Sequence, residues 1–191
     1  HQQTPAICMA AVKRFGGALQ FVKEQTPELC LFALRSYPLA LEFVKDQTPE
    51  LCMLAVDKRG LALKFVKEQT PTICLAAVAN NGLALEFVKE QTEDLCVIAV
   101  KQDGYALKFV KEQTPKICML AVEQRGHALQ YVKKQTSELC LEDVKDCGMA
   151  LEFVRKQTLR ICMTAVLDDG RALGFVQGEF YAACRRICYG Y

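Results

Sequence analysis

The chain has 191 residues, of which 51% are apolar and 24% are charged, and this composition excludes a disordered or collagen-like polypeptide. Its 24 basic and 22 acidic side chains give a net charge of +2, which predicts no nucleic-acid partner. No apolar run approaches the roughly 18 residues that cross a bilayer, and no charged-then-apolar leader opens the chain, so we expect no membrane partner.

The dominant feature of the sequence is a repeat with a period of 22 residues. Threonine, cysteine and glycine recur at this spacing without an insertion, except that Pro38 replaces one glycine. The threonines are Thr4, Thr26, Thr48, Thr70, Thr92, Thr114, Thr136 and Thr158, and the glycines are Gly16, Gly60, Gly82, Gly104, Gly126, Gly148 and Gly170. The chain therefore consists of about eight copies of one unit and a divergent tail.

Each unit predicts two short helices. Thr26 followed by Pro27 and Glu28 is a typical helix start, with threonine as the N-cap, proline at the first helical position and an acid in the first turn. The first helix should run over residues 27–36. The repeated glycine should end it in a left-handed conformation, and Pro38 should require a different turn because proline cannot adopt positive φ. A second helix should follow through the Ala-Leu-x-Phe-Val block to the next threonine.

The apolar faces of the two helices predict how they pack. Apolar side chains cover most of the first helix, which should be an enclosed inner layer, and only one face of the second, which should be an outer, solvated layer. Helices this short are stable only when units stack. The fold class is therefore all-α, an α-solenoid of about eight 22-residue two-helix repeats over residues 1–177. Residues 178–191 should form a C-terminal cap of the same domain, because Phe180, Cys184 and Ile187 can cover the last unit.

The repeated unit resembles a known family. Residues 82–92, read as Gly-Leu-Ala-Leu-Glu-Phe-Val-Lys-Glu-Gln-Thr, are followed by Leu95-Cys96 and Ala99-Val100. This unit is similar to a tandem helical repeat that is catalogued as a domain of unknown function and is found in proteins of intracellular bacteria, amoebae and large DNA viruses. The resemblance covers residues 1 to about 177. It implies no activity, cofactor or catalytic residue.

The eleven cysteines allow three interpretations. Disulfides are unfavourable, because neighbouring copies lie one helix spacing apart and the count is odd. A ladder of thiolates that binds a soft metal such as copper or zinc is a remote alternative, since no CxxC motif occurs and the only histidines are His1 and His127. The favoured interpretation is that the repeated cysteines are reduced, unligated core residues. Reduced thiols are expected of a protein in the cytoplasm, either of its own cell or of a host cell. Cys147, which lies at a turn, should be the readily modified thiol.

No arrangement of side chains predicts catalysis. His127 is the only interior histidine, and no Ser/His/Asp or Cys/His set occurs at a telling spacing, so we expect no enzyme, no cofactor and no metal site. Asp143 breaks a column that alanine otherwise occupies. A carboxylate there can be functional, but divergence of the repeat, with solvent relieving the charge, is the simpler interpretation.

Two surfaces could meet a partner. A column of basic residues runs from Lys23 to Arg155, and an acid directly follows most of its members. These acids cancel the positive charge and favour a solvated face over a nucleic-acid-binding stripe. The exceptions are the pairs Lys133-Lys134 and Arg155-Lys156, where no acid follows. The second surface consists of the positions that flank the turn between the two helices, which change in almost every copy although the core columns barely do. The predicted partner-binding residues on this edge are Phe15, Tyr37, Arg59, Tyr105, Arg125 and His127.

These observations favour a non-catalytic repeat scaffold that mediates protein–protein interaction. A structural spacer or a rod that assembles end to end is the alternative, and simple tolerance of change at turns would explain the variable edge without any partner. The chain also begins in mid-repeat at His1, which is expected of a fragment or a processed protein.

Overall fold

The computed structural model describes residues 3–189, and these residues form helices and connecting loops without a strand. Ten-residue α-helices alternate with six-residue 3-10 helices. The α-helices are α1 (Pro5–Arg14), α2 (Pro27–Ser36), α3 (Pro49–Lys58), α4 (Pro71–Asn80), α5 (Glu93–Gln102), α6 (Pro115–Gln124), α7 (Ser137–Asp146), α8 (Leu159–Asp168) and α9 (Phe180–Tyr189). The 3-10 helices are η1 (Gly16–Phe21), η2 (Pro38–Phe43), η3 (Gly60–Phe65), η4 (Gly82–Phe87), η5 (Gly104–Phe109), η6 (Gly126–Tyr131), η7 (Gly148–Phe153) and η8 (Gly170–Phe175).

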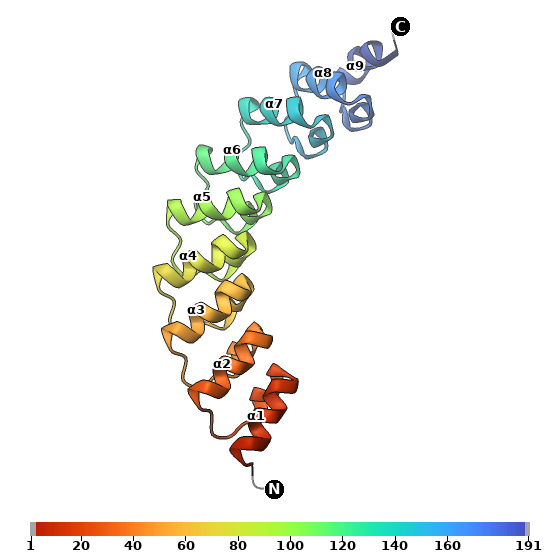
Figure 1. Cartoon of the computed structure of the whole chain (residues 1–191). Helices are drawn as coiled ribbons and strands as arrows, with labels where there is room; N and C mark the ends of the chain where they lie inside the picture. The colour runs from red at the N-terminus through yellow and green to blue at the C-terminus, as the bar shows by residue number, and fades with distance from the viewer. Residues whose placement is uncertain (1–2, 190–191) are drawn as a thin grey trace. The chain divides into compact units, whose positions relative to one another are not determined.

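The helices form two compact units, residues 1–102 and residues 103–191. The first unit holds α1 to α5 with η1 to η4, and the second holds η5 to η8 with α6 to α9. Within each unit, successive α-helices stack side by side, and an α-helix also packs on the 3-10 helix of the preceding repeat (Figure 1). This arrangement confirms the predicted all-α solenoid of 22-residue repeats.

Threonine starts the α-helices as predicted. The Oγ1 atom of Thr48 accepts a hydrogen bond from the backbone N–H of Leu51 at 3.4 Å, and Pro49 occupies the first helical position. Such a cap satisfies one of the backbone donors that the first helical turn leaves without a partner. The same bond, at 3.2 to 3.4 Å, is made by Thr4, Thr26, Thr70, Thr92, Thr114, Thr136 and Thr158.

The second helix of each repeat is shorter and tighter than the sequence predicts. It is a 3-10 helix that ends at its sixth residue, such as Phe65, and the following residue, Val66, is extended with φ −72° and ψ 117°. The N–H of Val66 still bonds to the carbonyl of Leu63 at 3.1 Å, three residues earlier. The prediction of a second helix that continues to the next threonine is therefore wrong in its length, because a glutamine side chain from the preceding repeat binds the backbone groups that would extend the helix.

The repeated glycines serve close packing and not a left-handed turn. Within residues 3–189, positive φ occurs only at Gly178, with φ 61°. A Cβ on Gly16 would lie 2.6 Å from the backbone carbonyl oxygen of Ala33 in the next repeat, so the missing side chain lets neighbouring repeats approach. Because this turn needs no positive φ, Pro38 begins η2 in the same place, with Tyr37 as its N-cap. The predictions of a left-handed glycine and of a different turn at Pro38 are thus wrong.

Replacing Gly60 with alanine is expected to lower the free energy of unfolding by about 1 to 3 kcal/mol, because the new Cβ would overlap the carbonyl oxygen of Ala77. Urea unfolding followed by circular dichroism measures this change. Gly170→Ala is the matched control, since the nearest atom to its new Cβ is Cys188 Sγ at 3.8 Å, and its effect should stay within about 0.5 kcal/mol. Equal effects of the two substitutions would contradict this account of the glycines.

Both layers contribute to the core. On α3, Leu51, Cys52, Ala55 and Val56 are buried while both ends of the helix are exposed. On η3 every residue is buried or half-buried except Lys64. The expected division into an enclosed first helix and a solvated second one is therefore wrong, because the repeats bury one side of each helix between neighbours.

Candidate functional site

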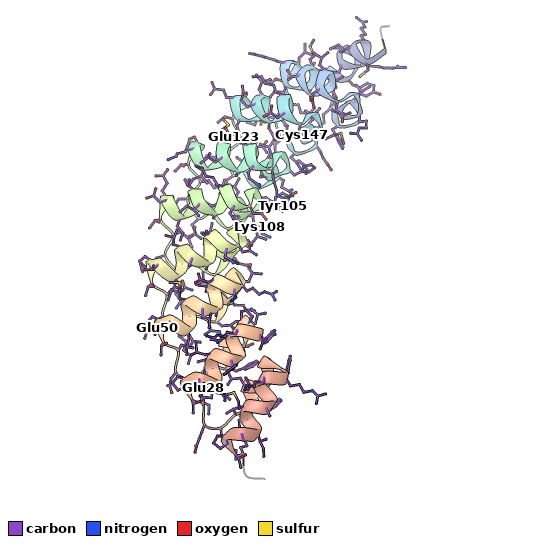
Figure 2. The ribbon with its side chains drawn as sticks, viewed as in Figure 1. Glu28, Glu50, Tyr105, Lys108, Glu123 and Cys147 are labelled. Carbon is purple, nitrogen blue, oxygen red and sulfur yellow. The ribbon has the colours of Figure 1, made fainter. Side chains whose placement is uncertain are left out.

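The candidate site lies where each α-helix turns into its 3-10 helix. We use the name turn edge for three positions of each repeat. They are the two residues before the grid position, which is the repeated glycine or Pro38, and the one residue after it. The residue at the turn is extended, as Arg59 is with φ −153° and ψ 104°, and its N–H bonds to the carbonyl of Ala55 at 2.9 Å. This backbone geometry recurs with little change from repeat to repeat, so the turn edge presents different side chains on one repeated frame (Figure 2).

In the first unit, the predicted residues of the turn edge lie on neighbouring repeats. Phe15 is 59% exposed, and its ring centroid lies 5.9 Å from that of the half-buried Tyr37. Arg59, on the repeat after Tyr37, is exposed. The structure thus brings Phe15 and Tyr37 into contact and leaves the charge of Arg59 open to solvent.

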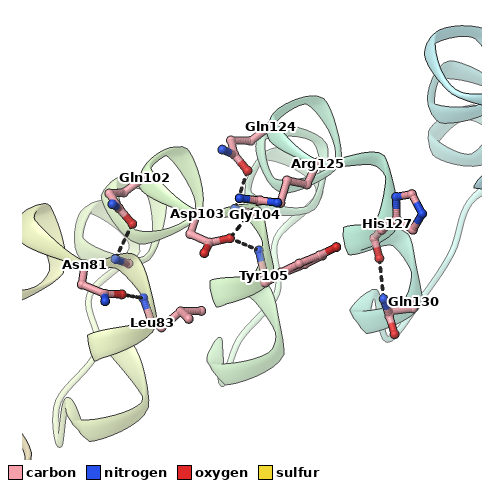
Figure 3. A network of polar contacts seen from close by, with 11 residues as sticks. Asn81, Leu83, Gln102, Asp103, Gly104, Tyr105, Gln124, Arg125, His127 and Gln130 are labelled. Atoms are coloured by element: carbon pink, nitrogen blue, oxygen red, sulfur yellow. Dashed lines mark hydrogen bonds and ion pairs between the residues drawn. The ribbon is translucent and has the colours of Figure 1, made fainter. Parts of the chain in front are cut away.

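In the second unit, three side chains of the turn edge form a cluster (Figure 3). The guanidinium carbon of Arg125 lies 5.0 Å from the ring centroid of Tyr105, and its Nε lies 3.3 Å from Asp103 Oδ1. Asp103 Oδ1 also accepts the N–H of Tyr105 at 3.0 Å. His127 is exposed, and its ring centroid lies 5.3 Å from that of Phe153. The cluster holds a cation, an anion and an aromatic ring at fixed positions.

Hydrogen bonds between repeats fix one position of the turn edge in several copies. Asn80 Oδ1 accepts the N–H of Gly60 at 2.7 Å, and Gln124 Oε1 accepts the N–H of Gly104 at 2.7 Å. Asp168 does the same for Gly148. A polar side chain two residues before the repeated glycine is the sequence signal for this bond, because only a side chain with an acceptor can reach the glycine of the preceding repeat.

A row of glutamines, half-buried except for the exposed Gln3, joins the repeats and was missed in the sequence analysis. Gln47 Nε2 donates to the carbonyl oxygens of Leu41 at 3.1 Å and Phe65 at 2.9 Å, and its Oε1 accepts the N–H of Lys67 at 3.0 Å. The amide therefore binds the backbone of its own repeat and of the next, and it replaces the hydrogen bonds of a longer second helix. Equivalent bonds are made by Gln3, Gln25, Gln69, Gln91, Gln113, Gln135 and Gln157.

The repeated cysteines belong to the same network. Cys52 Sγ lies 3.7 Å from Gln47 Oε1, and across the repeats this distance is 3.3 to 4.0 Å. All eleven cysteines are free, and burial raises the pKa of Cys140 and of Cys162 to about 11, which keeps them as thiols. Cys147 is half-buried, as are Cys8 and Cys188, so its predicted reactivity stays a prediction.

The basic column also has a structural role. Lys67 Nζ donates to the carbonyl oxygen of Lys45 at 2.7 Å, and Lys89 Nζ donates to that of Lys67 at 3.0 Å. Arg155 continues the pattern on Lys133. These ammonium groups bind the loop of the preceding repeat, which agrees with a solvated face and leaves fewer free charges for an anionic polymer.

Asp143 is buried and not relieved by solvent, so that expectation is wrong. The residue is 2% exposed, and its Oδ2 is a buried atom without a hydrogen-bond partner. Burial, and secondarily Asp146, raise the pKa of Asp143 to about 7. A Cβ on Gly126 would meet Asp143 Oδ1 at 2.8 Å, whereas a Cβ on Gly60, Gly104 or Gly148 would meet a backbone carbonyl oxygen. Gly126 is half-buried, and the other three glycines are buried. The carboxylate therefore separates two repeats that pack more closely elsewhere.

Residues 70–114 match the model of a family described as a domain of unknown function (DUF4116). The match runs from the N-cap of α4 to the N-cap of α6 and so covers two repeats, which confirms the resemblance there. The searches of curated proteins and of solved structures found no match.

Within residues 3–189, no helix is long and apolar enough to cross a bilayer. No group of three or more histidine, cysteine, aspartate or glutamate side chains there is placed to hold a metal ion.

Proposed function

We propose that the chain is a non-catalytic repeat scaffold that binds protein partners through its turn edges. The observation that supports this proposal is that the side chains of the turn edge differ among repeats while the backbone and the core positions stay the same. Core positions such as Leu63, Leu85 and Leu107 are fully buried and identical. The turn edge differs from repeat to repeat: the residue before the grid position is Tyr37 in one repeat and Arg59 in the next. A rigid scaffold with variable exposed side chains is the general design of binding repeat proteins.

The residue types on the turn edge suit a protein interface. Tyrosine and arginine are enriched among the residues that dominate binding energies, and aromatic contacts such as that of Phe15 with Tyr37 hold the rings in place before a partner arrives. The thiols give little support to catalysis, because burial raises their pKa and disfavours the nucleophilic thiolate.

Alanine substitutions on the turn edge test this function. Tyr37→Ala with Arg59→Ala, and separately Tyr105→Ala with Arg125→Ala, should each weaken partner capture by more than about 1 kcal/mol, a factor of about 5. Capture is measured with the immobilised full chain and lysate proteins quantified by mass spectrometry. Helix content and melting temperature should not change, since these side chains are exposed or half-buried.

The control is Lys64→Ala with Glu86→Ala, which removes two exposed side chains from the 3-10 helices and should leave capture unchanged. Undiminished capture by both turn-edge variants would move the binding site elsewhere on the scaffold.

A further inference from the structure

The loops that lead into the α-helices form a series of small cavities, each between the loop of one repeat and the loop of the next. In the first unit, one of these cavities lies between the loops that begin at Lys67 and Lys89. In the second unit, a cavity of about 340 Å³ lies between the loops that begin at Lys133 and Arg155. We call this second cavity the basic pocket, and its lining consists of Lys133, Lys134, Gln135, Thr136, Ser137, Cys140, Arg155 and Lys156.

The basic pocket differs from its counterparts in charge. The cavity at Lys67 and Lys89 also contains the carboxylates of Glu68, Glu90 and Asp94. The two cavities nearer the start of the chain likewise contain acids. In the basic pocket, lysine replaces the acid in both loops, and no carboxylate is part of the lining. Four cationic side chains therefore converge where the other repeats balance positive and negative charge.

The four cations have two different roles. Lys133 Nζ donates to the carbonyl oxygen of Lys111 at 2.7 Å, and Arg155 donates to that of Lys133 at 3.1 Å, so these two side chains are held against the backbone. Lys134 and Lys156 are exposed and make no hydrogen bond or ion pair within residues 3–189. The pocket thus has a fixed positive wall and two ammonium groups that are free to close on an anion.

The size and isolation of the pocket indicate its ligand. A phosphoryl group carries close to two negative charges and three strong acceptor oxygens, which suits several cations better than a single carboxylate does. A nucleic-acid strand needs a row of phosphate sites, but Glu112 and the acids of the other loops interrupt the row. The lining contains no large apolar side chain to enter a bilayer, whereas the cavity at Lys67 and Lys89 includes Leu75, Leu95 and Ile98.

We propose that the basic pocket binds the phosphoryl group of a phosphoserine or phosphothreonine presented by a partner protein. This inference rests on the proposed protein-binding function and adds the chemical class of a partner group. The hydroxyl of Ser137 is a further donor in the same wall. The turn edges and the basic pocket are separate sets of residues, so each can be altered without the other.

The test uses a fluorescent nine-residue glycine/alanine peptide with one phosphoserine and its unphosphorylated twin. The full chain should bind the phosphopeptide weakly and its twin at least 10-fold more weakly, measured by fluorescence anisotropy. Lys134→Glu with Lys156→Glu should reduce phosphopeptide affinity at least 10-fold without changing the melting temperature. Folding is expected to persist because an acid occupies these places in the five preceding loops, at Glu24, Asp46, Glu68, Glu90 and Glu112.

The matched control is Lys58→Glu with Lys116→Glu, which changes the net charge by the same amount at exposed positions and should leave affinity unchanged. A transplant provides a positive test: Glu68→Lys, Glu90→Lys and Asp94→Arg copy the charges of residues 134, 156 and 160 into the cavity of the first unit. The stoichiometry of phosphopeptide binding should rise from one to two.

Three results would overturn the proposal. They are equal binding of the two peptides, unchanged affinity in the Lys134→Glu/Lys156→Glu variant, and tighter binding of single-stranded DNA or of phosphatidylserine vesicles than of the phosphopeptide through the same lysines. The turn-edge alanine variants should bind the phosphopeptide normally. Failure of the phosphoryl-binding proposal can therefore be distinguished from failure of the proposed protein-binding function.

Discussion

Gln47→Ala is expected to lower the free energy of unfolding by about 3 to 4 kcal/mol. The substitution removes bonds to the carbonyl oxygens of Leu41 and Phe65, to the N–H of Lys67 and to Cys52 Sγ. A typical hydrogen bond contributes about 1 kcal/mol, and buried groups left without a partner cost more. Urea unfolding of the full chain, followed by circular dichroism, measures the change.

Two further variants isolate the role of the Gln47 amide. Gln130→Ala removes an exposed glutamine whose Nε2 bonds to the carbonyl oxygen of His127 at 2.9 Å, and it should cost less than about 0.5 kcal/mol. Gln47→Glu keeps the acceptor oxygen but turns a carboxylate oxygen toward two carbonyl oxygens, so it should destabilise nearly as much as alanine. If Gln47→Ala cost no more than Gln130→Ala, the glutamine row would not hold the repeats together.

Asp143→Ala is expected to raise the free energy of unfolding by about 2 to 4 kcal/mol at pH 8. Ionising this buried carboxyl is unfavourable, and its pKa rises from 3.8 to about 7 in the folded chain. Each pKa unit corresponds to about 1.4 kcal/mol. Alanine also occupies this position in the other repeats, where it is fully buried at Ala121 and Ala165.

The pH dependence of the Asp143 effect has a definite sign. The unfolded chain loses the proton near pH 4 and the folded chain retains it until about pH 7, so the stability of the native protein falls between these values as pH rises. The gain from Asp143→Ala should therefore be large at pH 8 and small at pH 4. The negative charge of Asp146 contributes to the raised pKa of Asp143, and Glu123 and Glu142 line the same cavity.

Two controls accompany the Asp143 prediction. Asp146→Ala removes an exposed acid of the same helix and should change stability much less. Ala121→Asp places a carboxyl at the equivalent buried position of the preceding repeat and should reproduce the loss and its pH dependence. A pH-independent gain for Asp143→Ala would show that packing, not charge, accounts for the cost.

The candidate site could be predicted from the sequence only in part. The location of the site could be predicted, because differences among copies at Tyr37, Arg59 and Tyr105 are visible along the chain. The contacts of the site could not be predicted, since the distance from Arg125 to Tyr105 depends on how one repeat packs on the next. The basic pocket could be predicted only in part. Lys134 and Lys156 break a charge pattern that is visible in the sequence, but only the fold brings their loops around one cavity.

The sequence by itself determined the repeat, its length, the start of each α-helix at a threonine such as Thr48 and the all-α class. These features follow from local rules of capping and periodicity that act within a few residues. Tertiary structure decided the rest. The 3-10 helix ends at Phe65 because Gln47 of the preceding repeat binds its backbone, Gly60 is required because Ala77 of the next repeat approaches it, and Asp143 is buried because its neighbours stack over it. Each of these outcomes depends on residues about 17 to 20 positions apart, whose separation in space is set only when the repeats pack.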